Sequence, residues 1–131
     1  MSSMKRLLSH WATANLLFLF SLNALACGYC LQDRIASVYD HVLVTQTRQL
    51  NQKMLYLIWD GPADHDEKTR RTLIEITSRI KGVTKGSVRV SLEPPTIGLA
   101  YQPLSISSEQ IETVLLQKLR TKKIVASVLQ E

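Results

Sequence analysis

Residues 87–103, SVRVSLEPPTIGLAYQP, contain two apolar runs, one on each side of a proline pair. In both runs, apolar side chains occupy every second position. A period of two is typical of β-strands that bury one face, and proline interrupts the pairing of a strand. We therefore predict two strands, 88–92 and 97–101, joined by a short connection at Pro94-Pro95.

The segment that follows these strands carries the signals of a helix start. Ser107 is followed three residues later by Gln110, and together they form a capping box. Apolar residues then recur at spacings of three and four, and alternation resumes near the C-terminal end. We expect a helix and a last strand, built on Ile111, Val114, Leu115 and Leu119 and on Ile124, Ala126 and Val128.

The segment before the two strands predicts another strand and helix. Residues 54–59 form a short apolar run closed by Asp-Gly-Pro, which is typical of a buried strand followed by a turn. Asp64, with Glu67 three residues on, resembles a capping box, and Gly82 is placed to end the helix. The expected buried stripe of this helix consists of Leu73, Ile76 and Ile80.

One more helix is expected upstream. Directly after Cys30, apolar residues recur at spacings of three and four, which predicts a helix running to about Thr47. After it the order is strand, helix, strand, strand, helix, strand, which is the split βαβ arrangement of ferredoxin-like α+β domains. We expect such a domain over residues 51–131, preceded by a CxxC-bearing helix over residues 27–50.

The N-terminal segment has the features of a secretory signal peptide. Lys5 and Arg6 precede an apolar run over residues 16–22, and Ala-Leu-Ala follows at residues 24–26. A positive region, a short apolar region and an A-x-A site define such a signal, and the run is too short to span a membrane. We predict that residues 1–26 are removed, that the protein is periplasmic or secreted, and that the mature chain has no transmembrane segment. A lipid anchor ranks second, because the residues before the site fit a lipobox poorly.

The length, charge and motifs of the sequence exclude several classes of function. Removal of residues 1–26 from the 131 leaves 105, which fits one domain with a modest core. The 16 basic and 11 acidic side chains of the whole chain are interspersed, which indicates a solvated surface, so we expect no nucleic acid as a partner. The sequence has no glycine-rich phosphate loop and no local nucleophile motif. Hydrolase or transferase activity therefore has no support, and the protein is expected to bind rather than catalyse unless its thiols are redox-active.

Both cysteines survive the predicted cleavage, within Cys27-Gly28-Tyr29-Cys30. At a helix start they lie near the positive end of the helix dipole, which favours the thiolate that binds soft metals and attacks disulfides. Two thiolates suit Cu(I), and with additional ligands they suit Zn. In an oxidising compartment the pair also forms a disulfide unless a metal or a reductant holds it open. Metal binding, redox chemistry and a structural disulfide therefore all remain open.

Residues 54–128 resemble the heavy-metal-associated domain of copper chaperones and metal-transporting ATPases. The resemblance is carried by Gly82-Val83, the strand 88–92, LAYQP at residues 99–103 and the helix that follows. In that family a Gly-Val ends the first helix, a strand follows, and a Tyr-x-Pro closes the next strand. The resemblance implies a ferredoxin-like fold, a soft metal ion such as copper, and a metal transporter of the cell envelope as a partner.

The position of the cysteines departs from that family. The family's Met-x-Cys-x-x-Cys lies in the loop between the first strand and the first helix. Here that loop, residues 60–66, reads DGPADHD and holds no sulfur. We therefore assign the candidate metal ligands to Cys27 and Cys30 on the extra N-terminal helix.

A second resemblance competes with the first. Cys27 and Cys30 at a helix start resemble the active-site motif of thioredoxin-like oxidoreductases, and Pro95-Thr96 resembles their proline loop. This resemblance implies that Cys27 attacks a disulfide, that Cys30 resolves the mixed disulfide, and that the partner is a redox protein. Against it, those proteins need a central strand immediately before the motif, where this chain has the signal peptide. A third interpretation is a non-catalytic module that only docks on a partner.

Three other potential ligands have simpler explanations. His41 lies about three turns from Cys30 on the predicted helix, too far to share a metal ion. His65 lies between two aspartates at a helix start, and we assign it to the capping of that helix. Met54 falls in a strand and is the last methionine after cleavage, which excludes a methionine-rich site.

We predict that the mature chain begins at Cys27 with a free amine, because the residues before it form an A-x-A site. Mass spectrometry of the purified mature protein, native and denatured, measures the N-terminal mass, any disulfide and any bound metal together. A diacylglycerol mass on Cys27 would instead show a lipid-anchored protein.

Overall fold

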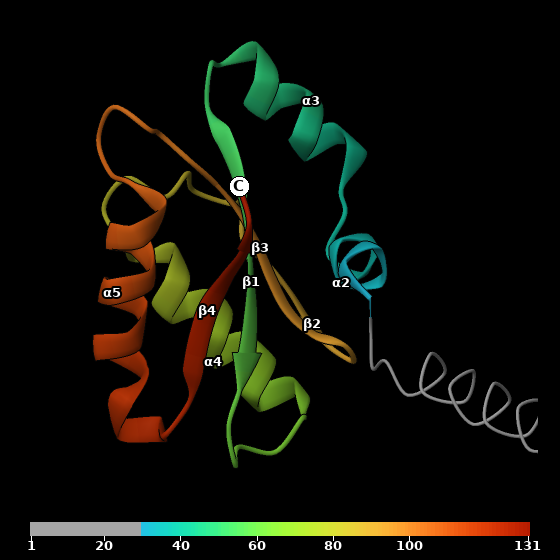
Figure 1. Cartoon of the computed structure of the whole chain (residues 1–131), viewed down its shortest axis with the longest axis vertical. Helices are drawn as coiled ribbons and strands as arrows, with labels where there is room; N and C mark the ends of the chain where they lie inside the picture. The colour runs from blue at the N-terminus through green and yellow to red at the C-terminus, as the bar shows by residue number, and fades with distance from the viewer. Residues whose placement is uncertain (1–29) are drawn as a thin grey trace, which may run out of the picture. The chain divides into compact units, whose positions relative to one another are not determined.

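The computed structural model describes residues 30–131, of which Leu31–Glu131 form one compact unit. Its elements (Figure 1) are α2 (Leu31–Ser37), α3 (His41–Gln49), β1 (Lys53–Asp60), α4 (Glu67–Ser78), β2 (Arg89–Leu92), β3 (Pro95–Tyr101), α5 (Ser108–Leu119), the 3₁₀ turn η2 (Arg120–Lys122) and β4 (Val125–Gln130). No helix within this part of the chain is long and apolar enough to cross a membrane. The predicted signal peptide and Cys27 lie outside the described residues. The predicted division between a leading helix and a domain at residue 51 stays a prediction.

The four strands form one antiparallel sheet in the order β2-β3-β1-β4. β1 pairs with β3 on one side and with β4 on the other, so that Leu57 lies opposite both Ile97 and Val128. β2 pairs with the other edge of β3. Along the chain, α4 connects β1 to β2, and α5 connects β3 to β4. This is the ferredoxin-like arrangement. The predicted fold class is confirmed.

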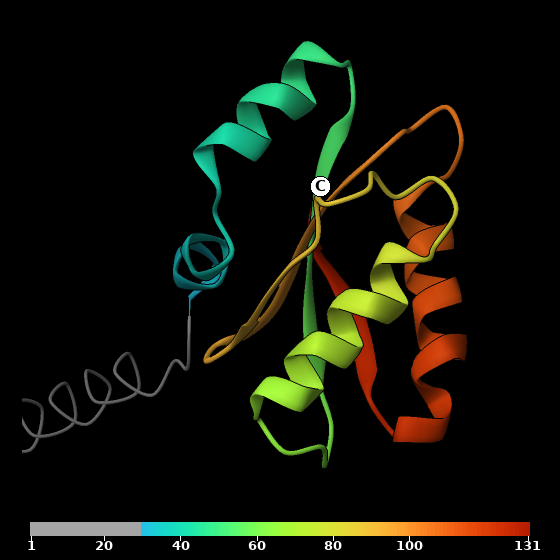
Figure 2. The ribbon, with the colours of Figure 1, turned by 180° about the vertical axis from the view of Figure 1, so that it is seen from behind.

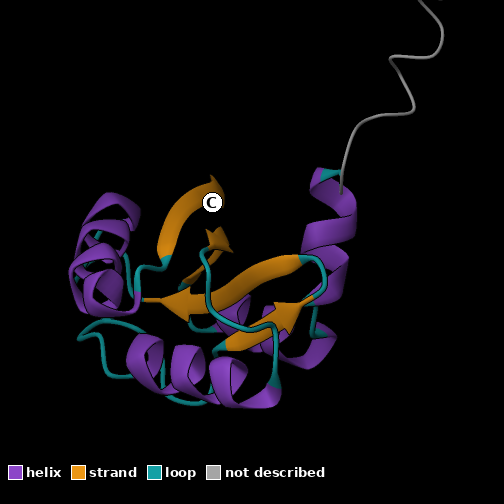
Figure 3. Ribbon diagram, turned by 90° about the horizontal axis from the view of Figure 1, so that it is seen from below, coloured by secondary structure: helices purple, strands orange, loops and turns teal. Residues whose placement is uncertain are grey.

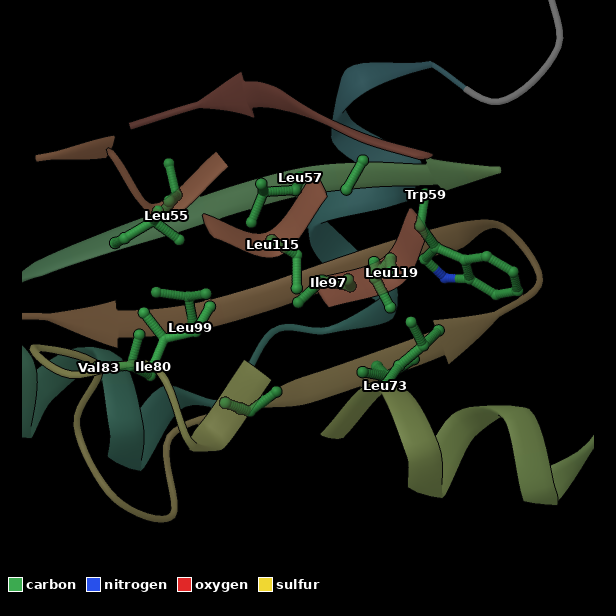
Figure 4. Packing of buried hydrophobic residues seen from close by; sticks show 14 of the residues in the cluster. Leu55, Leu57, Trp59, Leu73, Ile80, Val83, Ile97, Leu99, Leu115 and Leu119 are labelled. Atoms are coloured by element: carbon green, nitrogen blue, oxygen red, sulfur yellow. The ribbon is translucent and has the colours of Figure 1, made fainter. Parts of the chain in front are cut away.

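One face of the sheet packs against α4 and α5 and holds the main hydrophobic core (Figure 2). β1 and β3 each direct every second side chain into this core, because side chains alternate between the faces of a strand. Its buried members include Leu55, Leu57, Trp59, Leu73, Ile97, Leu99, Leu115 and Leu119 (Figure 4). Trp59 also donates its Nε1–H to the Ser91 carbonyl at 3.0 Å. The spacing of apolar residues therefore predicted most of this core, but Val128 of β4 is exposed and Ile76 of α4 is only partly buried.

The two helices on this face begin at capping residues. The Ser107 hydroxyl accepts a hydrogen bond from the Gln110 N–H, and the Gln110 side chain accepts one from the Ser107 N–H, so the predicted capping box of α5 is present. The predicted cap of α4 was wrong by two residues. Asp66, rather than Asp64, accepts a hydrogen bond from the Thr69 N–H at 2.8 Å.

The predicted end of α4 was also wrong, because the helix ends at Ser78 and Gly82 lies beyond it. Gly82 has a φ of +99°, which favours glycine. A Cβ at this position would lie 2.5 Å from Cγ2 of Ile106. Glycine is thus required here by the turn and by the close approach of Ile106.

The predicted leading helix is two helices, separated by Asp40 in an extended conformation. Asp40 Oδ1 accepts a hydrogen bond from the Leu43 N–H at 3.0 Å, and its Oδ2 pairs with Arg89. The prediction of one helix to Thr47 was wrong because the apolar spacing continues across both helices. The break is made by a capping side chain and a distant ion pair.

α2 and α3 cover the second face of the sheet, opposite α4 and α5, so that the strands lie between helices (Figure 3). An antiparallel sheet often leaves one face to solvent, yet Thr96, Gly98 and Ala100 of β3 are buried on this side. A Cβ added at Gly98 would lie 3.0 Å from Cγ2 of Val38. The residue that follows α2 therefore packs directly on the backbone of β3.

We predict that Gly98→Val destabilises the protein by about 1–3 kcal/mol, because the new side chain overlaps the methyl groups of Val38. Val38→Ala should recover part of that loss, since it removes those methyl groups. Chemical denaturation of both single variants and the double variant measures the coupling energy, which we expect to be on the order of 1 kcal/mol. Purely additive effects would contradict the packing of Val38 on Gly98.

Candidate metal-binding site

The predicted ligand pair lies at the start of α2. Cys27 is outside the described residues, whereas Cys30 directly precedes Leu31, the first residue of α2. The Cys30 side chain is exposed. A thiol at this place is accessible to a partner molecule without any opening of the core.

α2 is positioned by Arg34, which lies one helical turn after Cys30 in the sequence. The Nη1 of Arg34 donates a hydrogen bond to the carbonyl of Pro95 at 3.0 Å. Pro95 is the first residue of β3 and lies opposite Leu92 of β2. This hydrogen bond therefore ties α2 to the connection between β2 and β3, across a sequence separation of 61 residues.

Pro95 is the residue that the redox interpretation adds to the two cysteines. The structure places Pro95 beside α2, the helix that follows them, through the hydrogen bond from Arg34. The sheet, however, is antiparallel at every strand pairing described, and all four strands follow α3 in the chain. The described fold is thus ferredoxin-like, and it lacks the parallel pairing of a thioredoxin-like sheet.

The loop between β1 and α4 is organised by packing and capping. His65 Nδ1 lies 3.1 Å from the Leu92 carbonyl oxygen, and the His65 ring lies 4.8 Å from the Trp59 ring, centroid to centroid. Asp66 caps α4, and its hydrogen bond from the Thr69 N–H holds the pKa of its carboxyl below the usual value. In the described part of the chain, no group of three His, Cys, Asp or Glu side chains is arranged to hold a metal ion. The assignment of His65 to helix capping was wrong, since its ring packs on Trp59 instead.

His41 and Met54 are explained by local contacts. His41 is the exposed first residue of α3, and its Nδ1 lies 3.4 Å from the Tyr39 hydroxyl. Met54 is half-buried in β1, where its sulfur lies 3.5 Å from the Thr47 hydroxyl oxygen. Both residues have the structural roles that the sequence predicts for them.

Sequence reasoning missed the ion pair that anchors the start of α3. Arg89 Nη2 lies 3.0 Å from Asp40 Oδ2. The Leu43 N–H and the Arg89 guanidinium hold the pKa of Asp40 below its usual value. An aspartate before a helix pattern is a signal for a cap, whereas a pairing with a residue 49 positions away has no local signal.

No protein-family model and no curated protein matches this sequence. Solved structures are similar to it in fold. Oxidized MerP from Ralstonia metallidurans CH34 shares 18% identity at a TM-score of 0.47, over 60% of this chain and 99% of its own. A copper binding domain from HMA7, a P-type ATPase, shares 15% identity at a TM-score of 0.49, over 60% and 95%. The yeast copper transporter domain Ccc2a shares 17% identity at a TM-score of 0.46, over 59% and 94%.

The likeness is one of fold. The sheet order establishes that fold independently of these structures. The ferredoxin-like fold that the sequence resemblance implies is the fold observed. It assigns neither a metal nor its ligands to this chain.

We predict that Asp40→Asn lowers the melting temperature at pH 7, because it removes the charge that pairs with Arg89 and keeps a side chain that can cap α3. A carboxyl whose pKa is lower in the folded state stabilises the fold above its unfolded pKa, about 3.9 for aspartate, and loses this contribution as the pH falls through the folded pKa. The difference in melting temperature between wild type and variant should therefore become smaller below about pH 4.

Thermal unfolding between neutral and acidic pH measures this difference. Asp64→Asn, at an exposed loop residue, controls for the change of charge alone. A difference in melting temperature that stays constant down to the lowest pH would contradict the stabilisation of the fold by the Asp40–Arg89 pair.

Proposed function

We propose that this protein binds or passes a soft metal ion, copper in the first place, through the thiolates of Cys27 and Cys30. The observation that carries the proposal is a Cys-x-x-Cys that ends directly before α2. The domain that carries it is ferredoxin-like, and its own β1–α4 loop holds no sulfur. The sequence resemblance to heavy-metal-associated domains supports the same chemistry.

The chemistry needs only the cysteine segment. Two thiolates are ligands that Cu(I) prefers, and each thiol releases a proton when it binds the metal. After the predicted cleavage, the α-amino group of Cys27 is a third donor nearby. His65 is engaged with Leu92 and Trp59, so it is not needed as a ligand. The metal ion is cargo at the surface rather than a part of the core.

We further propose that the protein works outside the cytoplasm, in the periplasm or as a secreted protein. The support is the predicted signal peptide over residues 1–26. The proposed partner is a metal transporter of the cell envelope that offers thiolates of its own. Because Cys30 is exposed, the thiolates of the partner can reach the metal ion. They can then replace the ligands of this protein one at a time.

Thiol-disulfide exchange is a second candidate, favoured by the position of Pro95 beside α2. In that reaction the Cys27 thiolate attacks a disulfide of the partner, and the departing sulfur takes up a proton. Cys30 then loses its proton and attacks the sulfur of Cys27, which releases the second partner thiol. The partner disulfide is reduced to two thiols, and Cys27 and Cys30 are oxidised to a disulfide.

We predict that the reduced mature protein binds about one Cu(I) per chain and that Cys27→Ser/Cys30→Ser abolishes this binding. A competition titration against a Cu(I) chelator, under anaerobic and reducing conditions, measures the affinity. The double variant should stay folded by circular dichroism, because Cys30 is exposed and outside the core. His65→Ala is the control, and it should change the affinity little because its ring packs on Trp59.

Copper affinity that is unchanged in the double variant would contradict the site assignment. If the wild type bound no copper but exchanged a model disulfide, thiol-disulfide exchange would be the function. If it did neither, a non-catalytic docking module would be the remaining interpretation.

A further inference from the structure

α2 is held on the sheet less firmly than α3. None of the seven residues of α2 is buried, whereas α3 buries Leu43 and Thr47. Leu31, at the start of α2, keeps 44% of its surface exposed. A hydrogen bond from Arg34 to the Pro95 carbonyl joins α2 to the sheet. α2 therefore docks through half-buried contacts and contributes no side chain to the core.

A polar atom is buried without a partner on the face that α2 covers. Thr96 is fully buried, and its Oγ1 has no hydrogen-bond partner among the described residues. Thr96 points to this face because Ile97 belongs to the opposite core, and Gly98, on the same side as Thr96, meets Val38. A buried hydroxyl without a partner is destabilising, whereas water satisfies it once it is exposed. The docked position of α2 thus carries a cost that an undocked one does not.

Val38, Tyr39 and Asp40 connect α2 to α3. Val38 is buried on Gly98, but Tyr39 is 53% exposed, and Asp40 begins α3 with its own cap. The pairing of Asp40 with Arg89 fixes this start to β2. α3 therefore keeps its anchors when α2 leaves the sheet, and the hinge lies at Val38, directly after α2 ends at Ser37.

We propose that α2 is a hinged arm, which undocks from β3 as a unit while α3 stays in place. Undocking frees the Pro95 carbonyl and the Thr96 hydroxyl to bind water, and it moves the segment that carries the cysteines. This motion presents Cys30, which directly precedes α2, to thiolate ligands of a partner, a consequence that rests on the proposed metal function. A helix of seven residues is marginal on its own, so undocked α2 also unwinds.

Amide hydrogen exchange of the metal-free, full mature chain tests the arm, because undocking and unwinding expose the α2 amides to solvent. The amides of residues 35–37 should exchange at least tenfold faster than those of α3 and β3. Thr96→Val replaces the unpartnered hydroxyl by a methyl group. It should slow the exchange of residues 35–37 on the order of tenfold and leave α3 unchanged.

Thr77→Val is the matched control. Thr77 lies in α4, is fully buried, and likewise has an Oγ1 without a partner among the described residues. The same chemical change on the α4 side should leave the exchange of residues 35–37 unaltered. Arg34→Ala should speed that exchange, whereas Arg48→Ala, at an exposed arginine of α3, should not.

Equal exchange of α2 and α3 would overturn the proposal. So would a Thr96→Val variant that leaves α2 unchanged, or a Thr77→Val variant that slows it as much. Because the exchange is measured without metal, these outcomes are independent of the copper titration. A protein that binds copper but has no independent opening of α2 would keep its proposed function and lose the arm.

Discussion

Six of the seven residues of β3 are buried, because helices cover this strand from both sides. On one side Ile97 and Leu99 join the core beneath α4 and α5. On the other side, Val38 packs against the backbone of Gly98, which has no side chain. A strand with two buried faces needs both layers to keep its apolar surface from water. The segment with α2 and α3 therefore shields the second face of β3 from water.

The Cys-x-x-Cys of this chain lies before α2 and not in the loop between β1 and α4. In this chain the β1–α4 loop is occupied by His65 against Trp59 and by the cap at Asp66. The cysteine segment precedes a helix that Arg34 ties to Pro95, at the beginning of β3. β1 ends and β3 begins at the same end of the sheet, because the two strands are antiparallel. The sheet has the ferredoxin-like order, while the candidate ligands lie in a segment that precedes all four strands described.

A residue that carries the sequence resemblance proves to be structural. Tyr101 is fully buried and donates its hydroxyl to the Glu131 carboxylate, which also accepts hydrogen bonds from Lys53 and Ser108. Burial and the hydrogen bond to Glu131 raise the pKa of Tyr101, while the Tyr101 hydroxyl lowers the pKa of Glu131. These contacts join β3, β1 and α5 to the end of the chain. Tyr101 therefore stabilises the fold and is not one of the candidate metal ligands.

The sequence by itself determined the strands, the capping box at Ser107 and the core beneath α4 and α5, because alternation and capping act between residues two to four positions apart. It also supplied the Cys-x-x-Cys. The tertiary structure alone decided the second helix layer, the pairing of Asp40 with Arg89 and the placement of α2. Those features rest on pairs such as Arg34 with Pro95, which are 61 residues apart. Their partners become neighbours only when the sheet has formed, so no local pattern encodes them.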